Sequence, residues 1–311
     1  MSRNHLLLLC SALPLVACSS DGEVTAEGPK HPYVVSEVTV PSTGPQAMEL
    51  GLDLNGDKIV DNQLGAVLAA LATSGFKVQD ALTTAINEGS IVLLASIQTK
   101  DFKSSGGAGF QVFIGDTATV MPAPCASATD TTCRRHLDGN GTFTIAASSP
   151  TNAEVTGKIA GGTFNGGPGD ISLTIALGSA EGVRLDLIGA RAKATGMSDT
   201  GVESVIVAGA LTQDDLNNKV IPEIFKQLGP IVTSDCTGTG TDCGCMNGST
   251  GKTILSLFDN MPKDCKLVVE EIQNSALLKN LLASDVEIDG KAALSVGVKV
   301  KAVKANFTPP E

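Results

Sequence analysis

Five residues in an acidic run have the types and spacing of a metal-binding loop. Counted from Asp53, side-chain oxygens stand at positions 1, 3, 5 and 9, and a backbone carbonyl is available at position 7. Hard cations such as calcium take about six to eight oxygen ligands, which carboxylate, amide and carbonyl groups supply. We therefore predict a calcium site formed by Asp53, Asn55, Asp57, Ile59 and Asp61.

This run resembles the calcium loop of EF-hand and dockerin-type proteins, with two departures. Lys58 stands at position 6, where the family has a turn-forming glycine, and Leu64 stands at position 12, where it has a bidentate glutamate. A second interpretation stays open, an acidic turn that caps a helix beginning near Asn62, because the positive end of the helix dipole favours negative charge. Weaker versions of the pattern begin at Asp259 and Asp285.

The N-terminal residues predict export and anchoring. Residues 1–17 combine Arg3 with an apolar run from Leu6 to Val16, which is too short to span a bilayer and is typical of a secretory signal. The following Leu-Val-Ala-Cys, which ends at Cys18, resembles the bacterial lipobox. This resemblance implies cleavage before Cys18 and acylation of that residue by fatty acids such as palmitate. Ser19 implies sorting to the outer membrane, so we expect a lipid-anchored protein of the bacterial cell envelope.

Six cysteines remain after the signal and the anchor, and an even number in an exported chain predicts disulfide bonds. Cys125 and Cys133 flank a polar loop and are expected to pair with each other. The spacing of the other four lacks the close pairs of a zinc site. Two sets of bonds stay open for them: Cys236–Cys243 with Cys245–Cys265, or Cys236–Cys245 with Cys243–Cys265.

The body of the chain alternates between helical and strand patterns. Apolar residues at helical spacing predict helices at 62–73, 78–88, 212–228, 252–259 and 267–282. Alternating apolar residues between Gly and Asp turns predict strands, and one of these turns is the Gly-Gly-Pro-Gly run at 166–169. The expected strands are 91–97, 109–114, 117–121, 142–147, 153–160, 170–177, 183–195, 202–210 and 293–307.

These elements predict an α+β fold, with an antiparallel β-sandwich or open barrel as its core and short helices flanking it at both ends. We expect a flexible tether at 18–48, in which Tyr33 to Val40 forms a short docking strand, and a single body at 49–308. The β-rich centre of that body covers 105–211, and a disulfide-containing helical segment covers 212–282.

Composition and motifs argue against several function classes. A net charge of −11, with no Trp and one Tyr, argues against generic nucleic-acid binding. No catalytic residue is predicted, because neither G-x-S-x-G nor H-E-x-x-H occurs and His136 is interpreted as a loop residue. The Gly248–Thr253 run lacks the first glycine of a P-loop, where Met246 stands.

Four features together are similar to a family of uncharacterised, myxobacterial-type envelope lipoproteins. They are the lipobox, the Asp53 loop, the Phe258–Glu271 segment and the 281–297 stretch. The resemblance implies a location but no activity. We therefore expect a non-catalytic structural or ligand-binding protein, joined to the membrane through its anchor, with an apolar small ligand or an envelope protein as partner. The alternatives are a lipid or apolar-ligand binding or transfer protein, and a hydrolase with an unrecognised site.

Overall fold

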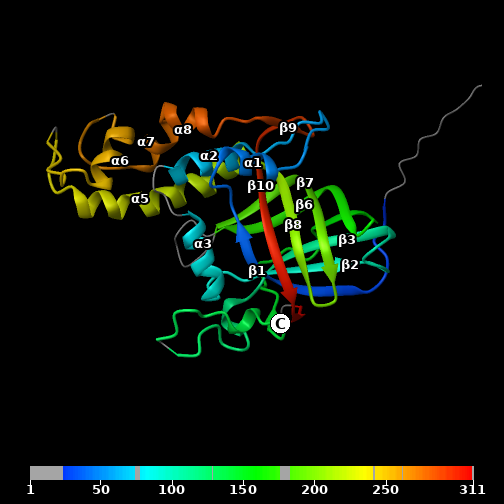
Figure 1. Cartoon of the computed structure of the whole chain (residues 1–311). Helices are drawn as coiled ribbons and strands as arrows, with labels where there is room; N and C mark the ends of the chain where they lie inside the picture. The colour runs from blue at the N-terminus through cyan, green and yellow to red at the C-terminus, as the bar shows by residue number, and fades with distance from the viewer. Residues whose placement is uncertain are drawn as a thin grey trace, which may run out of the picture.

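An antiparallel sheet that closes on itself forms the core of the protein (Figure 1). The computed structural model describes residues 24–73, 78–127, 129–175, 183–240, 242–260 and 262–309. Within these residues the sheet has nine strands in the order β1-β2-β3-β5-β6-β7-β8-β10-β9, and β1 also pairs with β10. The α+β prediction with an antiparallel core is confirmed. The predicted core was a sandwich or an open barrel, whereas the pairing of β1 with β10 makes the sheet a closed barrel.

The longer strands of the described sheet form the wall of the barrel and bury the side chains on their inner faces. They are β1 (Lys30–Thr39), β2 (Leu93–Gln98), β3 (Ser105–Ile114), β5 (Glu154–Ala160), β6 (Thr163–Ile175), β7 (Val183–Ser198), β8 (Gly201–Thr212) and β10 (Lys291–Lys304). The short β9 (Val286–Ile288) pairs only with the start of β10 in the described sheet. The closing register joins Tyr33 to Lys304 and Thr39 to Lys299.

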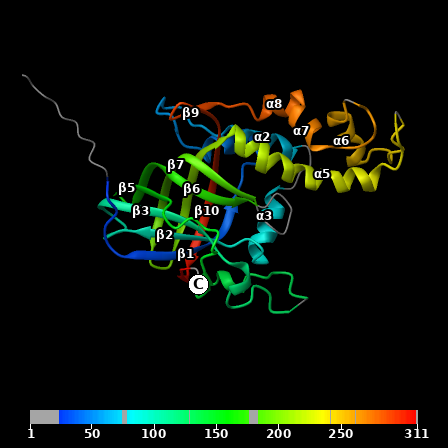
Figure 2. The same cartoon turned by 180° about the vertical axis from the view of Figure 1, so that it is seen from behind.

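The two ends of the barrel are built differently. At one end, which we call the short-turn end, neighbouring strands are joined by residues 99–104, 161–162 and 199–200, and residues 24–29 lead into β1. At the other end, which we call the helical end, all the α-helices of the described chain emerge, as does the long 115–153 connection. Figure 2 shows this connection below the barrel, where β4 (Thr142–Thr144) pairs with β11 (Asn306–Thr308).

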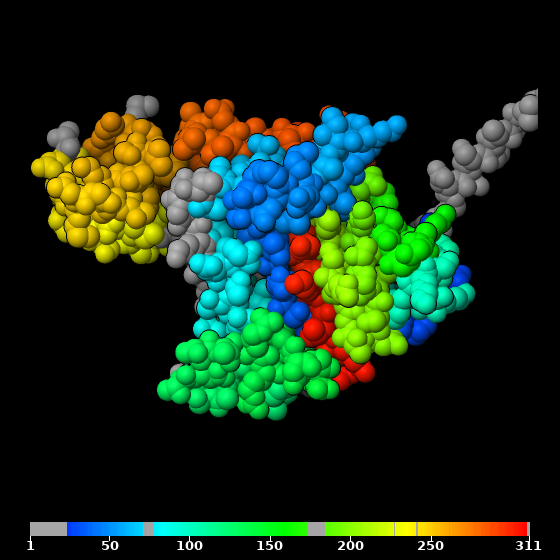
Figure 3. Space-filling view, in the orientation of Figure 1, coloured from blue at the N-terminus to red at the C-terminus, as the bar shows by residue number. Residues whose placement is uncertain are grey.

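Helices occupy two stretches of the chain, one between β1 and β2 and one between β8 and β9. Between β1 and β2 lie α1 (Gly44–Glu49), α2 (Gln63–Thr73) and α3 (Val78–Asn87). After β8 come α4 (Gln213–Asp215), the π-helical turn η3 (Leu216–Val220), α5 (Ile221–Asp235), α6 (Thr250–Phe258), α7 (Val269–Asn274) and α8 (Ala276–Leu281). We call residues 213–282 the helical lobe. It stands beside the barrel as the yellow and orange surface in Figure 3.

The barrel interior is filled by apolar side chains, which are aliphatic except for Phe110. Val35, Val207 and Val298 come from different strands, and Leu82 and Ile86 of α3 close the helical end. A void of about 50 Å³ remains among them, with almost no polar atom on its surface. Apolar voids of this kind stay dry, so the interior is a packed core.

Several local predictions were wrong. The expected strand at 117–121 is a 3₁₀ turn (η1, Thr117–Thr119), because the Asp116 carboxylate accepts the Ala118 N–H and bends the chain. The expected Gly-Gly-Pro-Gly turn lies inside β6, where the register shifts. The strand predicted at 33–40 is present as β1, but it is a full strand of the barrel and does not belong to a flexible tether that runs to residue 48. The expected 267–282 helix breaks at Ser275 into α7 and α8.

Candidate functional site

A hollow with largely apolar walls lies between helices rather than inside the barrel. We call it the interhelical pocket. It has a volume of about 560 Å³ and is lined by α2, α5, α6 and α8. Its apolar wall includes Val67, Leu228, Ile254, Leu257, Leu277 and Leu281. Leu257 and Leu277 form part of the rim, since each keeps 44% of its surface exposed.

Hydroxyl groups line the part of the pocket formed by the start of α6. Ser249 is the N-cap of this helix, and its Oγ accepts the Lys252 N–H at 3.3 Å. Thr253 Oγ1 donates to the Ser249 carbonyl at 3.4 Å. Together with Thr250 these residues give the pocket a polar, uncharged end. None of the described lining residues is charged, so the pocket suits an apolar molecule with a small neutral polar group.

Amphipathic helices explain why the hollow has an apolar wall. In α6, Ile254 and Phe258 are four residues apart and share one helix face with Leu257. In α5, Ile224 and Leu228 share a face in the same way. These side chains are the apolar stripes that the sequence predicts, and the pocket is the space that the stripes leave between them.

Disulfide bonds hold the helical lobe together. Cys236 at the end of α5 is bonded to Cys245, and Cys243 is bonded to Cys265. This is the second of the two predicted sets, and the predicted Cys125–Cys133 bond is also present. The bonds fix the 236–265 segment against α5, and so fix the position of α6 in the pocket wall.

One of these disulfides also contributes both sulfurs of a cluster of possible metal ligands. Among the described residues, only Cys243, Asp259 and Cys265 bring three ligand atoms of His, Cys, Asp or Glu within 4.8 Å of one another. Both sulfurs belong to the same disulfide and are not thiolates, which are the form that binds metals. The Asp259 carboxylate accepts the N–H groups of Asp264 and Cys265 instead, at 3.1 and 3.0 Å.

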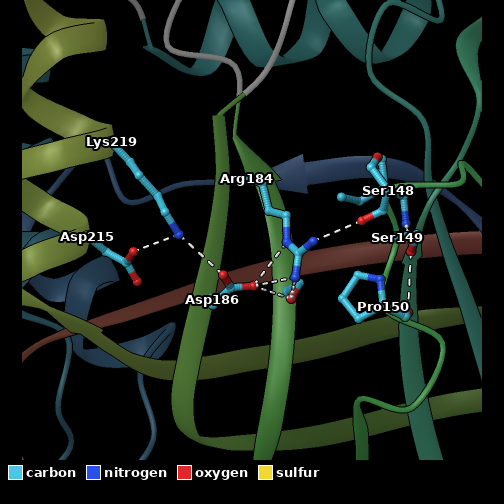
Figure 4. Close-up of polar contacts among 9 residues, drawn as sticks. Ser148, Ser149, Pro150, Arg184, Asp186, Asp215 and Lys219 are labelled. Atoms are coloured by element: carbon cyan, nitrogen blue, oxygen red, sulfur yellow. Dashed lines mark hydrogen bonds and ion pairs between the residues drawn. The ribbon is translucent and has the colours of Figure 1, made fainter.

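A polar network pins the start of the helical lobe to the barrel (Figure 4). Lys219 Nζ in η3 lies 2.6 Å from Asp215 Oδ1 and 3.2 Å from Asp186 Oδ2 on β7. Asp186 Oδ1 also accepts the Ser172 hydroxyl at 2.5 Å and lies 3.0 Å from the Arg184 guanidinium. Arg184 extends the network by donating to the Ser148 carbonyl at 2.8 Å.

This network shifts the pKa values of Asp186 and Lys219. Burial alone would raise the pKa of Asp186, but hydrogen bonds from Ser172, Arg184 and Lys219 outweigh it and hold that pKa below its usual value. The hydrogen bond to Asp215 is the main cause that raises the pKa of Lys219. Because each charge is matched by its neighbours, the network positions α5 and its side of the pocket and leaves no activated nucleophile in this group of residues.

The predicted calcium loop is closed by its own backbone. Asp53 Oδ1 accepts the Gly56 N–H at 2.6 Å, and Asp53 Oδ2 accepts the Lys58 N–H at 2.9 Å. Asp57 Oδ1 accepts the Ile59 N–H at 2.7 Å. Lys58 has a φ of 70°, so it adopts the left-handed conformation for which the related loops have glycine at this position. The turn therefore forms despite the Lys58 departure.

The carboxylates of this loop are not gathered around one point. Among described residues, Asp53, Asp57 and Asp61 do not form a group with ligand atoms within 4.8 Å of one another. Asp61 is buried and its Oδ2 accepts the Leu54 N–H at 2.7 Å. Burial raises the pKa of Asp61, and the carboxylates of Asp57, Asp285 and Asp53 raise it further. Calcium binding would need the side chains to turn inward, and it stays a prediction.

The side chain that caps α2 is Asn62, whereas a carboxylate of the acidic turn was predicted. Its Oδ1 accepts the Gly65 N–H at 3.0 Å in the first turn of α2 and the Gly297 N–H of β10 at 2.8 Å. Its Nδ2 donates to the carbonyls of Gly297 and Ala47. This buried amide therefore ties three segments together at the helical end of the barrel.

One residue, His136, and one segment, Gly248–Thr253, have environments that the sequence did not reveal. His136 was interpreted as a loop residue, and it does lie in a short 3₁₀ turn (η2, Arg135–Leu137), but only 1% of it is exposed. The Gly248–Thr253 run does begin a helix, but the Gly251 N–H donates to the Asp235 carboxylate at 2.8 Å. An acid on this N–H group disfavours a phosphate there.

No protein-family model, curated protein or solved structure matches this chain. Cys18, the predicted lipid-attachment residue, lies outside the described residues, as does the signal at 1–17. In the part of the chain that the structure describes, no helix combines the length and apolar character needed to cross a membrane. The functional argument therefore depends on the chain's own residues.

Proposed function

We propose that this protein is a lipid-anchored, non-catalytic component of the bacterial cell envelope that binds an apolar ligand in the interhelical pocket. The lipobox-like sequence at Cys18 supports the anchor, and Ser19 supports the outer-membrane location. The observation that carries the binding role is the pocket of about 560 Å³, with aliphatic walls and hydroxyl groups where α6 begins. Small-molecule sites have roughly 300–1,000 Å³ and this mixture of lining groups.

The proposed ligand site lies between helices and not inside the barrel. The void inside the barrel measures about 50 Å³, which is far below the size of a lipid chain, so a ligand there would require α3 to leave. The interhelical pocket needs no such rearrangement, since the rim residues Leu257 and Leu277 are already exposed. This contrast favours the helical lobe as the binding region.

The described segment that leads into β1 lies at the opposite end of the barrel from the helices that form the pocket. The Glu27 N–H donates to the Gly107 carbonyl of β3, which fixes the segment that leads from the tether to the short-turn end. The helices that form the pocket emerge from the helical end. A chain attached at Cys18 would therefore approach the membrane from the side of the short turns and leave the helical lobe free for a ligand.

Mass spectrometry of the native protein after mild extraction tests the binding role. We expect a co-purifying apolar molecule of defined mass, and loss of that molecule in a Leu277→Asp variant, because a rim carboxylate cannot be desolvated by an apolar ligand. Val268→Asp is the matched control, since Val268 is 43% exposed in the same lobe but does not line the pocket. Native protein without any bound molecule, and without uptake of an added fatty alcohol, would contradict the proposal.

Calcium is a proposed stabiliser rather than part of the binding function. With a Kd of about 10⁻⁴ M and calcium at about 1 mM, mass action would add about 1.4 kcal/mol to the free energy of unfolding. Melting with calcium and with chelator measures this effect. The same melting temperature in both would leave Asp53, Asn55, Asp57, Ile59 and Asp61 as an acidic turn.

A further inference from the structure

A disulfide-bonded segment holds α3 in place at the helical end of the barrel. Arg134, next to the Cys125–Cys133 bond, donates from Nη1 to the Asn87 side-chain carbonyl at 2.6 Å and from Nη2 to the Ser36 carbonyl at 3.3 Å. Asn87 is the last residue of α3, and Ser36 lies on β1. This segment, of which residues 124–127 and 129–138 are described, therefore clamps the end of α3 to a strand of the barrel. We call it the 124–138 segment.

His136 is the buried part of this clamp. Its ring makes a hydrogen bond with the Ile86 backbone of α3 and lies 6.2 Å from the Phe143 ring, measured between centroids. Its Nδ1 atom is buried and has no hydrogen-bond partner among the residues that the structure describes. A neutral imidazole tolerates this arrangement with Nδ1 as an unprotonated acceptor. A second proton on Nδ1 would place a donor and a charge where no acceptor is available.

Ile86, the hydrogen-bond partner of His136, also closes the barrel at its helical end. Ile86 and Leu82 of α3 line the 50 Å³ void inside the barrel, together with side chains from the strands. Movement of α3 away from the 124–138 segment would therefore uncover the apolar interior. The closed state depends on contacts at the end of α3, among which the His136–Ile86 bond is buried.

We propose that His136 is an acid-sensitive latch, whose protonation releases α3 and opens the apolar interior of the barrel. The charged groups that face it are Arg134 and Asp138 of its own segment, whereas α3 presents the Ile86 backbone and the neutral Asn87 amide. Arg134 opposes a positive charge on the ring and Asp138 favours it, so the missing Nδ1 partner and burial decide the balance. This inference concerns the barrel and does not depend on the interhelical pocket.

The direction of the effect follows from linkage. Burial is the main cause that lowers the pKa of His136 below its usual 6.5, and Arg134 lowers it further, while the Ile86 hydrogen bond and Asp138 act in the opposite sense. The open state binds a proton more readily than the closed state. The free-energy difference that favours the closed state is therefore largest above the usual histidine pKa. It decreases as the pH falls from that value to the lowered pKa of His136.

Hydrogen exchange tests the latch in the full chain. Between about pH 7.5 and pH 5, with intrinsic exchange rates corrected, we expect the amides of α3 to lose protection about tenfold for each unit by which the pKa of His136 is lowered. The amides of β7 and β8 should keep their protection. His136→Gln retains a side-chain donor for the Ile86 carbonyl but does not titrate, so its α3 protection should be independent of pH.

Two further arms keep the test decisive. His31→Gln is the control, because His31 pairs with Asp199 at the short-turn end and the latch should act normally without it. If His136→Gln does not fold, the His136 ring resonances of the native chain should titrate together with the loss of α3 protection. Protection that is unchanged by acid, or the same acid-induced loss in His136→Gln, would overturn the proposal.

Discussion

The barrel interior and the interhelical pocket are both lined by aliphatic side chains, but they are closed by different means. Hydrogen-bonded strands surround the barrel on all sides, and the side chains of facing strands fill it to a residual void of about 50 Å³. The pocket lies between four helices and keeps about 560 Å³. Disulfides and an ion-pair network hold two of these helices, α5 and α6, through contacts outside the pocket.

This difference shows that apolar composition alone does not decide whether a space is filled. A continuous strand ladder sets the distance between facing side chains, and neighbouring strands cannot separate without breaking that ladder. Short helices joined by cystines have no such ladder between them. The helical lobe can therefore keep a hollow without losing its fold, which makes it the better candidate for binding.

The largest effect expected from breaking this arrangement comes from the lobe's disulfides. Replacing Cys243 and Cys265 by serine removes a bond with a sequence separation of 22 and should lower the free energy of unfolding of the lobe by about 3 kcal/mol. Hydrogen exchange should show lost protection in α6, with β7 and β8 protected as before. Equal loss in the barrel strands would mean that lobe and barrel unfold as one unit.

A second test concerns the junction between the barrel and α2, which forms one wall of the pocket. Asn62→Ala removes a buried amide that serves Gly65, Gly297 and Ala47 and leaves their backbone groups unpaired. The free energy of unfolding should fall by about 2 kcal/mol. Chemical denaturation measures it, and Asn55→Ala on the exposed loop is the control. Equal effects of the two substitutions would contradict the role given to Asn62.

The network around Asp186 should give a smaller effect that depends on pH. Asp186→Asn removes the charge that faces Lys219 and Arg184, and since these side chains are partly exposed we expect a loss of about 1 kcal/mol. Because the pKa of Asp186 is lowered in the folded state, its contribution is present above the usual aspartate pKa and is lost as the pH falls through the lowered one. Denaturation curves at neutral and strongly acid pH should therefore show the difference between native and variant only at neutral pH.

The smallest effect on the free energy of unfolding is expected at Lys58. This residue lines neither the barrel interior nor the interhelical pocket, so it is a reference for substitutions outside both. Its φ of 70° is unfavourable for a side chain with a Cβ atom, so Lys58→Gly should raise the free energy of unfolding by about 0.5 kcal/mol. Lys58→Ala separates the backbone effect from the loss of charge and should not stabilise. A stabilising Lys58→Ala would assign the gain to charge instead.

The local elements could be predicted because their residues carry local signals. The helices at 62–73 and 78–88 and the strands at 153–160 and 202–210 are confirmed within a few residues, since their apolar spacing is intact. The Cys125–Cys133 bond follows from loop length. The 117–121 strand failed because one side-chain contact, from Asp116 to the Ala118 N–H, outweighs an alternating pattern of only five residues.

Long-range closure could not be predicted. The pairing of Tyr33 with Lys304 makes a strand of the expected tether a wall of the barrel, and no local pattern encodes a contact across the whole chain. The pocket joins Val67 of α2 to Leu277 of α8, each of which looks like an ordinary core position in its own helix. The burial of His136 likewise depends on Ile86 and Phe143, which are distant in sequence or on another element.

The most direct test of the central claim is a binding titration of an apolar fluorescent probe with a hydroxyl group against three forms of the full chain: native, Leu277→Asp and Val268→Asp. The account predicts saturable binding to the native chain and to Val268→Asp, and a loss of affinity of tenfold or more in Leu277→Asp, about 1.4 kcal/mol. Equal affinity of all three forms, or no saturable binding to the native chain, would contradict a ligand site in the interhelical pocket.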